Sequence, residues 1–343
     1  MSLQPVQGFV SLETHHCVTG SMRHIYEAYG HPIREEMLLG LGAGAGFVYW
    51  HMKGTTPFLG GRANVGRPGE EGMEKTAGKR TGVKIEFHET GSASKAERVL
   101  REMLQANQPV MLQVDMGFLP YLELSEEYHF GAHMIVAAGY DPQSERVLIA
   151  DRDSELHPIT MRDLALARGS KFKPFPPKHR WYTFDFAGVR KPYPEEVRAA
   201  IMEVATGMLE PPITNLGVKG IRKAARRCLK WPESMEGEQL RNAYFNVFIF
   251  IDAEGGTGGG LFRYMYGRFL KQAAAITGRK RLAKVGSSMQ AIGDLWQEVA
   301  GLFKRAYDVS QPTELLIEAT GKMNLIADQE QQAWEQLREI VSA

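Results

Sequence analysis

The chain has 343 residues, 43% of them hydrophobic and 24% charged, and its 41 basic and 40 acidic side chains leave a formal net charge of +1. This length allows two domains of ordinary size. The composition excludes an intrinsically disordered chain and a broad polyanion-binding surface, so no nucleic-acid partner is expected. The longest apolar run, residues 245–251, falls far short of the roughly 20 residues that cross a bilayer, and the N-terminus lacks the pattern of a secretory signal. We therefore expect a cytoplasmic protein without a membrane partner.

The first half of the sequence predicts an α+β domain, residues 1–188, with helices first and a mostly antiparallel sheet after them. Apolar residues at helical spacing predict a helix over 17–29, which Gly30 would end. A short helix over 33–39 precedes the glycine-rich GLGAGAG and a strand, FVYWHM. A further helix over 95–106 begins with a capping-box pattern of Ser94 and Glu97. The strands that follow are PVMLQVD, HMIVAAGY, RVLIADR and HRWYTFDF.

The second half, residues 189–343, predicts an all-helical domain. Proline-rich segments at 174–177 and 191–194 mark the change, and no convincing period-two strand follows them. The expected helices cover 195–209, 217–231, 237–254, 261–276, 281–307 and 313–341.

Two glycine-rich segments need separate interpretations. GLGAGAG follows a helix and precedes a strand, the reverse of a dinucleotide-binding fingerprint, so it predicts a tight turn or a close-packed cleft wall. EGGTGGG, residues 254–260, precedes a helix but lacks the Gly-Lys-Ser/Thr of a nucleotide P-loop. Either it holds an anion on backbone N–H groups beside the catalytic cleft, or it is an interhelical loop.

The chain has two cysteines, Cys17 and Cys228, which excludes a disulfide framework and a structural zinc site of several thiolates. Cys17 stands where a helix begins, and the positive end of a helix lowers the pKa of a thiol. The alternative is an inert core residue, as free cysteines often are. The surrounding THHCVTGS, with two adjacent histidines, favours a nucleophile, whereas Cys228 is expected to be a packed helix residue.

A cysteine nucleophile needs a base, and His133 is the best candidate among ten histidines. The strands from residues 133 and 146 form a predicted hairpin with a turn at 141–144. If partner numbers sum to about 285, His133 lies opposite residues 151–153, Asp-Arg-Asp. The alternation of the strand favours Asp151 over Asp153 as the carboxylate that orients the ring. The alternative is that His133 is a strand-end residue bonded to backbone.

Several motifs resemble one known family. HHCVTGSMRHIYEAYGHPIREEMLLGLGAGAGFVYW, LGGR, QPVMLQVDMGFLPY, HFGAHMIVAAGYD and VLIADRD, spread over residues 10–190, resemble the N-terminal domain of the butirosin-biosynthesis acyltransferase family. The resemblance implies a papain-like fold related to the double-glycine leader peptidases. It also implies an antibiotic-biosynthesis enzyme that moves an acyl group from an acyl carrier protein to an amine. GTGGGLFRYMYGRFL resembles the helical domain that accompanies this catalytic domain.

Carried over by position, the resemblance makes Cys17 the nucleophile, His133 the base and Asp151 the orienting acid. It implies no cofactor and no metal, and the acyl-phosphopantetheine arm of the carrier protein would be the donor substrate. One position departs from the pattern of papain-like peptidases, which commonly carry a glutamine six residues before the cysteine as an oxyanion donor. Ser11 stands there, and Gln7 is too early, so the expected donor is the Cys17 backbone N–H with His16 or another group.

The first expectation is therefore an acyltransferase that uses an acyl-cysteine intermediate and a small amine acceptor. Hydrolysis of a peptide or amide by the same triad and a catalytically silent scaffold remain open, because the triad serves transfer and hydrolysis alike. A basic helical face is either solvated surface or a match for the acidic surface of a carrier protein. Asp115 is favoured as a strand-end hydrogen-bonding residue over a substrate contact. Weaker pocket candidates are Tyr121, Arg62 and Arg263, and the basic face comprises Arg222, Lys223, Arg226, Arg227 and Lys230.

Overall fold

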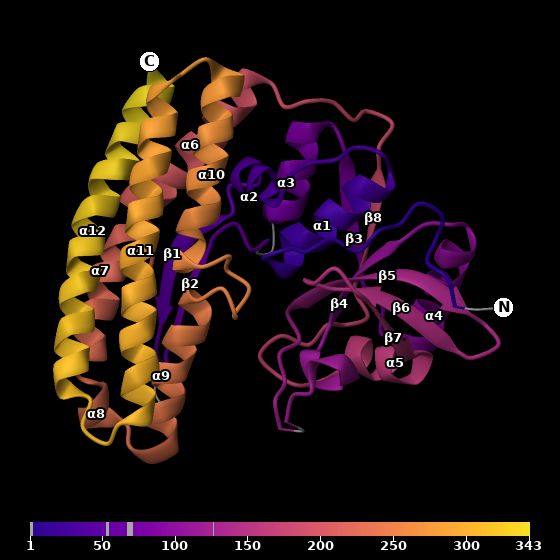
Figure 1. Cartoon of the computed structure of the whole chain (residues 1–343), viewed down its shortest axis with the longest axis horizontal. Coiled ribbons are helices and arrows are strands. Elements are labelled where there is room, and N and C mark those ends of the chain that lie inside the picture. Colours follow the sequence, from indigo (N-terminus) through magenta and orange to yellow (C-terminus); the bar gives the residue numbers. More distant parts are fainter. Residues whose placement is uncertain (1–2, 53–54, 67–70, 126) are drawn as a thin grey trace. The chain divides into compact units, whose positions relative to one another are not determined.

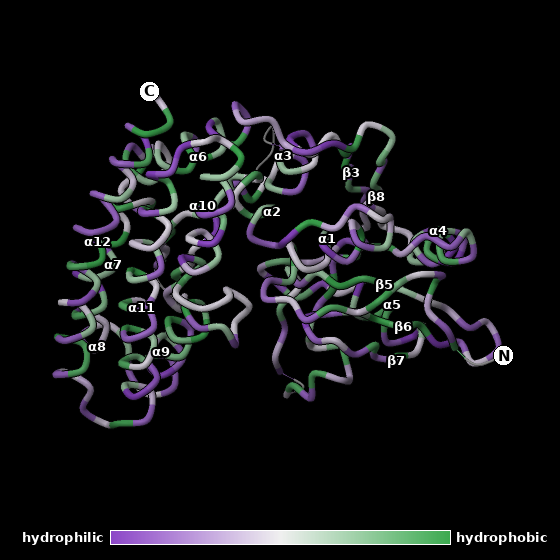
Figure 2. Tube along the Cα trace, turned by 45° about the horizontal axis from the view of Figure 1, so that its top comes forward, coloured by the Kyte–Doolittle hydropathy of each residue, from purple (hydrophilic) through white to green (hydrophobic). Residues whose placement is uncertain are grey.

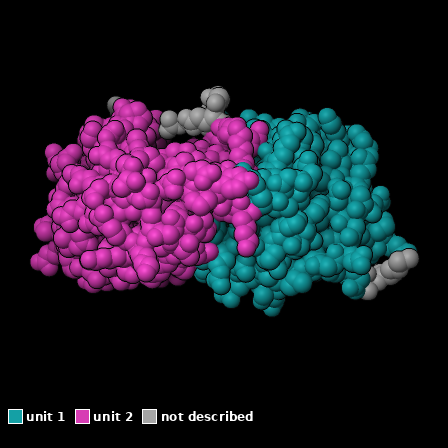
Figure 3. All heavy atoms as spheres, turned by 90° about the horizontal axis from the view of Figure 1, so that it is seen from above, with its two compact units in different colours: residues 1–38, 81–190 teal, residues 39–80, 191–343 magenta. Residues whose placement is uncertain are grey.

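The computed structural model describes residues 3–52, 55–66, 71–125 and 127–343. It confirms the α+β class, with antiparallel sheets in the first half of the chain and helices from residue 194 onward (Figure 1). The chain divides into two compact units, coloured separately in Figure 3. The first comprises Met1–Leu38 and Thr81–Arg190, and the second comprises Leu39–Arg80 and Lys191–Ala343.

The first unit is built on a six-stranded antiparallel sheet with the order β3-β8-β4-β5-β6-β7. The central strand β4 and most of β5 are buried without alternation, as expected of strands covered on both faces. Helices α1 and α4 contact β5, and α5 contacts β4. The strands are β3 Lys84–His88, β4 Val110–Val114, β5 His133–Asp141, β6 Arg146–Ala150, β7 Leu156–Thr160 and β8 Trp181–Asp185; the helices are α1 Cys17–Ala28, α4 Ala93–Gln105, α5 Met161–Gly169 and the 3₁₀ turns Met116–Phe118 and Pro120–Leu122.

Most predicted elements of this unit are present, with two kinds of difference. The edge strands β3 and β7 were not predicted. The alternation of KIEFH is only five residues long and has two apolar positions, and Leu156 and Ile159 of LHPIT do not alternate. The helix α4 begins two residues early, and Ser92 caps it by accepting a hydrogen bond from the Lys95 N–H at 3.2 Å. The Ser94 hydroxyl instead contacts that of Ser92, so the predicted capping box does not form.

The second unit is a helical bundle with an inserted hairpin. The hairpin and α3 come from residues 39–80, which the sequence assigned to the first domain, so the compact units differ from a division at residue 188 by this segment. Its Phe47 ring stacks on Trp296 at 5.8 Å. The strand pattern of FVYWHM identified a strand but not its packing partner. The elements are β1 Ala45–Trp50, β2 Phe58–Arg62, α3 Gly72–Thr81, α6 Pro194–Leu209, α7 Gly217–Cys228, α8 Trp231–Ser234, α9 Gly237–Ile251, η3 Gly260–Phe262, α10 Arg263–Thr277, α11 Arg281–Asp308 and α12 Thr313–Ser342, while α2 Glu35–Leu41 crosses the boundary between the units.

A buried ion pair ties the bundle together. Arg263 donates from Nε and Nη2 to the two carboxylate oxygens of Glu330, each at 2.8 Å. The indole N–H groups of Trp296 and Trp334 donate to the same carboxylate at 3.0 Å, and Arg263 Nη1 donates to the Gly46 carbonyl at 2.8 Å. Arg263, which the sequence analysis named as a pocket candidate, is thus hydrogen-bonded inside the second unit.

The glycine-rich loop of residues 254–260 has a packing explanation. Gly256, Gly258, Gly259 and Gly260 have positive φ, and a Cβ on Gly260 would lie 2.7 Å from the Cα of Gly293. The Gly260 N–H donates to Gln297 Oε1 at 2.8 Å, and the Gly259 N–H donates to Thr257 Oγ1 at 3.1 Å. Two of the N–H groups offered to an anion are therefore already bonded, and a position beside the catalytic cleft stays a prediction.

The long helices of the second unit are amphipathic, and hydrophilic and hydrophobic residues alternate along α11 and α12 in Figure 2. Within the part of the chain that the structure describes, no helix has both the length and the apolar character required to span a membrane.

Candidate active site

Cys17 is the first residue of α1, as predicted, and a buried carboxylate fixes the turn before it. Glu35 accepts hydrogen bonds from the backbone N–H groups of His15 at 2.8 Å and His16 at 3.1 Å. The Thr19 hydroxyl donates to the same carboxylate at 3.1 Å, and the His16 ring accepts from the Thr19 N–H as the helix N-cap. These contacts hold the half-buried thiol at the positive end of the helix. Sequence reasoning missed Glu35, which lies at the start of α2, where acidic residues are common in any helix.

The segment before α1 is tied to the chain that follows β6. The Thr14 N–H donates to the Arg152 carbonyl at 2.7 Å, and the Ser11 hydroxyl donates to the Asp153 carbonyl at 3.0 Å. The start of α1 is therefore anchored beside the predicted carboxylates. Ser11, at the position where a glutamine was expected, uses its hydroxyl for this anchoring, so an oxyanion donor at the Cys17 backbone N–H stays a prediction.

The structure brings the three predicted site residues together. His133 is the first residue of β5 and Asp151 directly follows β6, with their side chains 4% and 5% exposed. The His133 Nε2–H donates to Asp151 Oδ2 at 2.8 Å. His133 and Cys17 also interact, since each shifts the pKa of the other, and with Nε2 bonded to Asp151 the ring nitrogen left for the sulfur is Nδ1. The expected partner of the ring, Asp151 and not Asp153, is confirmed, whereas the catalytic roles of the three residues stay a proposal.

The hairpin reaches this arrangement by a register slightly different from the predicted one. Asp141 pairs with Arg146 and Val136 with Ala150, with an irregularity between them, so partner numbers sum to 287 near the turn and 286 farther on. The predicted sum was about 285. Pairing ends at Ala150, and the next residue, Asp151, reaches the ring as a diagonal neighbour. The parity that selects the face was right, and the ring bonds a diagonal neighbour on that face.

The surroundings favour charges on all three groups. Burial raises the pKa of Cys17, but hydrogen bonding and charge from His133, a backbone hydrogen bond from Met134 and the charge of Arg152 together lower it below its usual value. Burial lowers the pKa of His133, yet the charge and hydrogen bond of Asp151, with those of Cys17, raise it to about 10. The His133 interaction likewise outweighs burial and lowers the pKa of Asp151. These shifts favour the thiolate, the imidazolium and the carboxylate over the corresponding neutral groups.

A second layer of side chains orients Asp151. The Tyr121 hydroxyl donates to Asp151 Oδ2 at 2.9 Å, the oxygen that also accepts from His133. The Tyr121 ring stacks on His157 at 4.2 Å and 13°, and His157 Nε2 contacts both carboxylate oxygens of Asp153 at 2.9 and 3.0 Å. Tyr121, one of the weaker pocket candidates, is thus placed to position Asp151, whereas Asp153 contacts His157 and not the His133 ring.

Two other candidates have structural roles. Asp115 is fully buried and accepts from the N–H groups of Gly117 and Phe130 and the hydroxyl of Ser170, at 3.1, 3.0 and 2.6 Å. This confirms a strand-end hydrogen-bonding residue. Cys228 is buried in α7, and burial raises its pKa, which confirms a packed residue. Among the described residues, no group of three or more histidine, cysteine or acidic side chains is arranged to hold a metal ion.

Fold and site together define a class: an α+β protein in which a cysteine at a helix N-terminus meets a histidine–aspartate pair on an antiparallel sheet. Residues 16–152, which include all three residues, match the family described as butirosin biosynthesis protein H, N-terminal. Residues 162–337 match a domain of unknown function, DUF4872. The first part of the chain, residues 16–152, therefore belongs to the butirosin biosynthesis protein H N-terminal family, as the motifs indicated. No curated protein sequence matches the chain.

Proposed function

We propose that the chain is an acyltransferase that moves an acyl group from a carrier-protein thioester to a small amine through an acyl-Cys17 intermediate. Family membership indicates a biosynthetic enzyme of the butirosin kind. The observation that supports the chemical step is a site in which His133 hydrogen-bonds Asp151 and interacts with Cys17. Its lowered thiol pKa and raised imidazole pKa are the conditions for a ready nucleophile and a proton donor.

The first half-reaction loads the enzyme. The Cys17 thiolate attacks the thioester carbonyl carbon and forms a new carbon–sulfur bond. The bond to the carrier sulfur breaks, and the His133 imidazolium gives its Nδ1 proton to the departing carrier thiolate. One thioester replaces another, so this step is close to balance.

The second half-reaction discharges the acyl group. The amine attacks the acyl-Cys17 carbonyl, and the neutral His133 ring takes the amine proton at Nδ1. The carbon–sulfur bond breaks, an amide leaves, and the thiolate–imidazolium pair is restored. Throughout the cycle Asp151 holds Nε2–H, which keeps Nδ1 toward the sulfur and stabilises the imidazolium whenever it forms.

The test is mass spectrometry of the intact protein after mixing with a loaded acyl carrier protein. We expect an acyl mass on Cys17 that is absent from Cys17→Ala and unchanged by Cys228→Ser. The adduct should persist in buffer and discharge to an amide when the cognate amine is added, because a transferase must keep water from its intermediate.

Two results would replace the proposal. Rapid loss of the acyl group in water alone would identify a hydrolase. If no thioester or peptide labels Cys17, and iodoacetamide modifies it no faster than the buried Cys228, the low-pKa nucleophile does not exist and the chain is a scaffold of this fold.

A further inference from the structure

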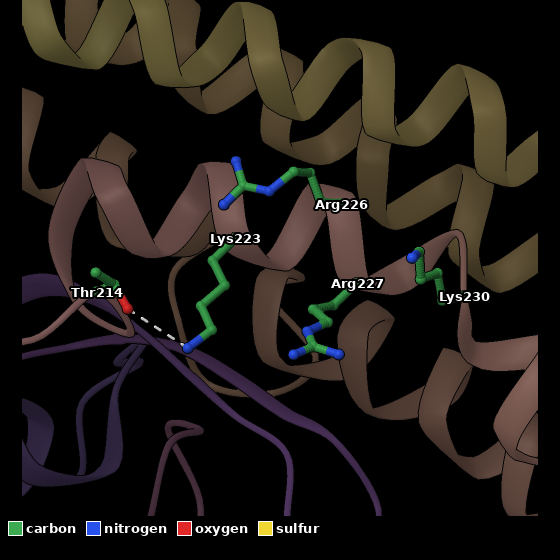
Figure 4. A pocket seen from close by; sticks show the side chains of 5 residues that line it. All are labelled: Thr214, Lys223, Arg226, Arg227 and Lys230. Atoms are coloured by element: carbon green, nitrogen blue, oxygen red, sulfur yellow. Dashed lines mark hydrogen bonds between the residues drawn. The ribbon is translucent and has the colours of Figure 1, made fainter.

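A basic cavity lies on the second unit, in a part of the chain to which the proposed chemistry gives no task. It has a volume of about 450 Å³ and is lined by Thr214, Lys223, Arg226, Arg227 and Lys230 (Figure 4). The four cations recur three or four residues apart along α7 and just beyond it. In Figure 4, Lys223 and Arg227 extend from the same side of α7, and Arg226 extends from the other.

No carboxylate among the described residues contacts these four charges. Lys223 Nζ donates to Asn215 Oδ1 at 2.7 Å and contacts Thr214 Oγ1 at 3.5 Å, both neutral groups that fix the ammonium without compensating it. The side chains of Arg226, Arg227 and Lys230 are exposed and make no hydrogen bond or ion pair with any residue that the structure describes. The neighbouring Arg222, which does not line the cavity, behaves differently, since it donates to Asp328 at 2.6 Å.

Helix stability does not explain the cluster. Cations in the last turn of α7 suit the negative end of its dipole, which accounts for Arg226 and Arg227. Lys223 lies in the middle of the helix, and its i,i+4 neighbour is Arg227, a repulsive pair. Burial and the charge of Arg227 also lower the pKa of His51, so that ring stays neutral at pH 7 and adds no charge. A concave surface with several uncompensated charges concentrates anions from solution.

We infer that this cavity binds the phosphate group of a small phosphorylated ligand. An ammonium supplies a point charge, a guanidinium supplies a planar pair of donors that matches phosphate oxygens, and the Thr214 hydroxyl stands beside them. The volume is that of a small-molecule site. The inference does not depend on the acyltransferase proposal, because every residue it uses belongs to the second unit.

The experiment is calorimetric titration of the full chain with inorganic phosphate, pyrophosphate and an oligoglutamate peptide at low ionic strength. We expect the two phosphates to bind and the double variant Lys223→Gln/Arg227→Gln to lose at least about tenfold in affinity, since each lost contact is charge-assisted. Lys219→Gln, which removes one charge as Arg227→Gln does but at an exposed position of α7 outside the cavity, should bind like the wild type.

The rate of Cys17 alkylation should be the same in all these variants, which shows that they fold and separates this test from that of the proposed function. Arg227→Gln alone provides a milder variant if the double one folds poorly. The inference is overturned if the wild type binds neither phosphate nor pyrophosphate, or if the double variant binds them as tightly. Oligoglutamate binding in the absence of phosphate binding would also overturn it, in favour of a docking surface for an acidic protein.

Discussion

Replacing Asp151 with Asn removes the charge that stabilises the His133 imidazolium while leaving the shape of the site. The amide oxygen can occupy the place of Oδ2 and still accept from His133 and from Tyr121. The variant therefore isolates the electrostatic part of the interaction. Asp153→Asn is the matched control, because it removes one charge from a carboxylate that contacts His157 and not His133.

The magnitude follows from Coulomb's law. The nitrogen and oxygen are 2.8 Å apart and both side chains are at most 5% exposed, so salt screens the pair weakly. Charge centres about 4 Å apart at an effective dielectric constant of about 20 interact by about 4 kcal/mol. That energy corresponds to about 3 pKa units. The pKa of His133, raised to about 10, should therefore fall toward its ordinary range in Asp151→Asn.

The assay is the pH dependence of Cys17 alkylation by iodoacetamide. In the wild type the lowered pKa of Cys17 keeps the thiol ionised at pH values below the ordinary pKa of a cysteine. The raised pKa of His133 keeps the imidazole protonated up to about pH 10. Losing the imidazolium raises the pKa of the thiol, so the Asp151→Asn profile should move to higher pH and acyl transfer should fall about 10²–10³-fold. Asp153→Asn should leave the alkylation profile nearly unmoved and should reduce acyl transfer by less than about tenfold. Equal losses in the two variants, or an unmoved profile in Asp151→Asn, would refute the reasoning.

Three further substitutions test the supporting contacts, each measured by urea unfolding. Tyr121→Phe keeps the stack on His157 but loses the hydrogen bond to Asp151, so the free energy of unfolding should fall by about 1.5–3 kcal/mol. An unchanged free energy would show that Tyr121 does not position Asp151. Glu35→Gln should cost a similar amount and slow Cys17 alkylation as well, whereas Glu27→Gln, exposed on the same α1, should do neither. Glu330→Gln leaves Arg263 buried without its counter-charge and should cost about 3–5 kcal/mol, and a loss under about 1 kcal/mol would show that the pair is dispensable.

The predictions that succeeded depended on local patterns. The helix start at Cys17 follows from apolar spacing within a few residues, and the partner of His133 follows from the alternation of one hairpin. Even there, the irregularity between Ala137 and Gly139 shifted the register by an amount that no residue pattern announced.

What the sequence did not disclose depends on tertiary packing. Glu35 reaches across to the turn before Cys17, and Tyr121 reaches Asp151 from a 3₁₀ turn, so neither contact leaves a periodic signal. The packing of residues 39–80 within the second unit also depends on tertiary contacts and has no periodic signal in the sequence. A strand pattern predicts that one face of the strand will be buried, but it does not predict which element packs on that face.

The two cysteines show why the chemistry of a site cannot be inferred from residue type and helix position alone. Both belong to helices, and burial raises the pKa of each. At Cys228 burial outweighs a backbone hydrogen bond, and the pKa of the thiol rises. Cys17 faces an imidazole that Asp151 keeps charged, and the attraction exceeds the cost of burial. We therefore expect the carboxylate of Asp151 to set the reactivity of Cys17 through His133, so that a change at Asp151 alters the pKa of the thiol although the two side chains do not bond to each other.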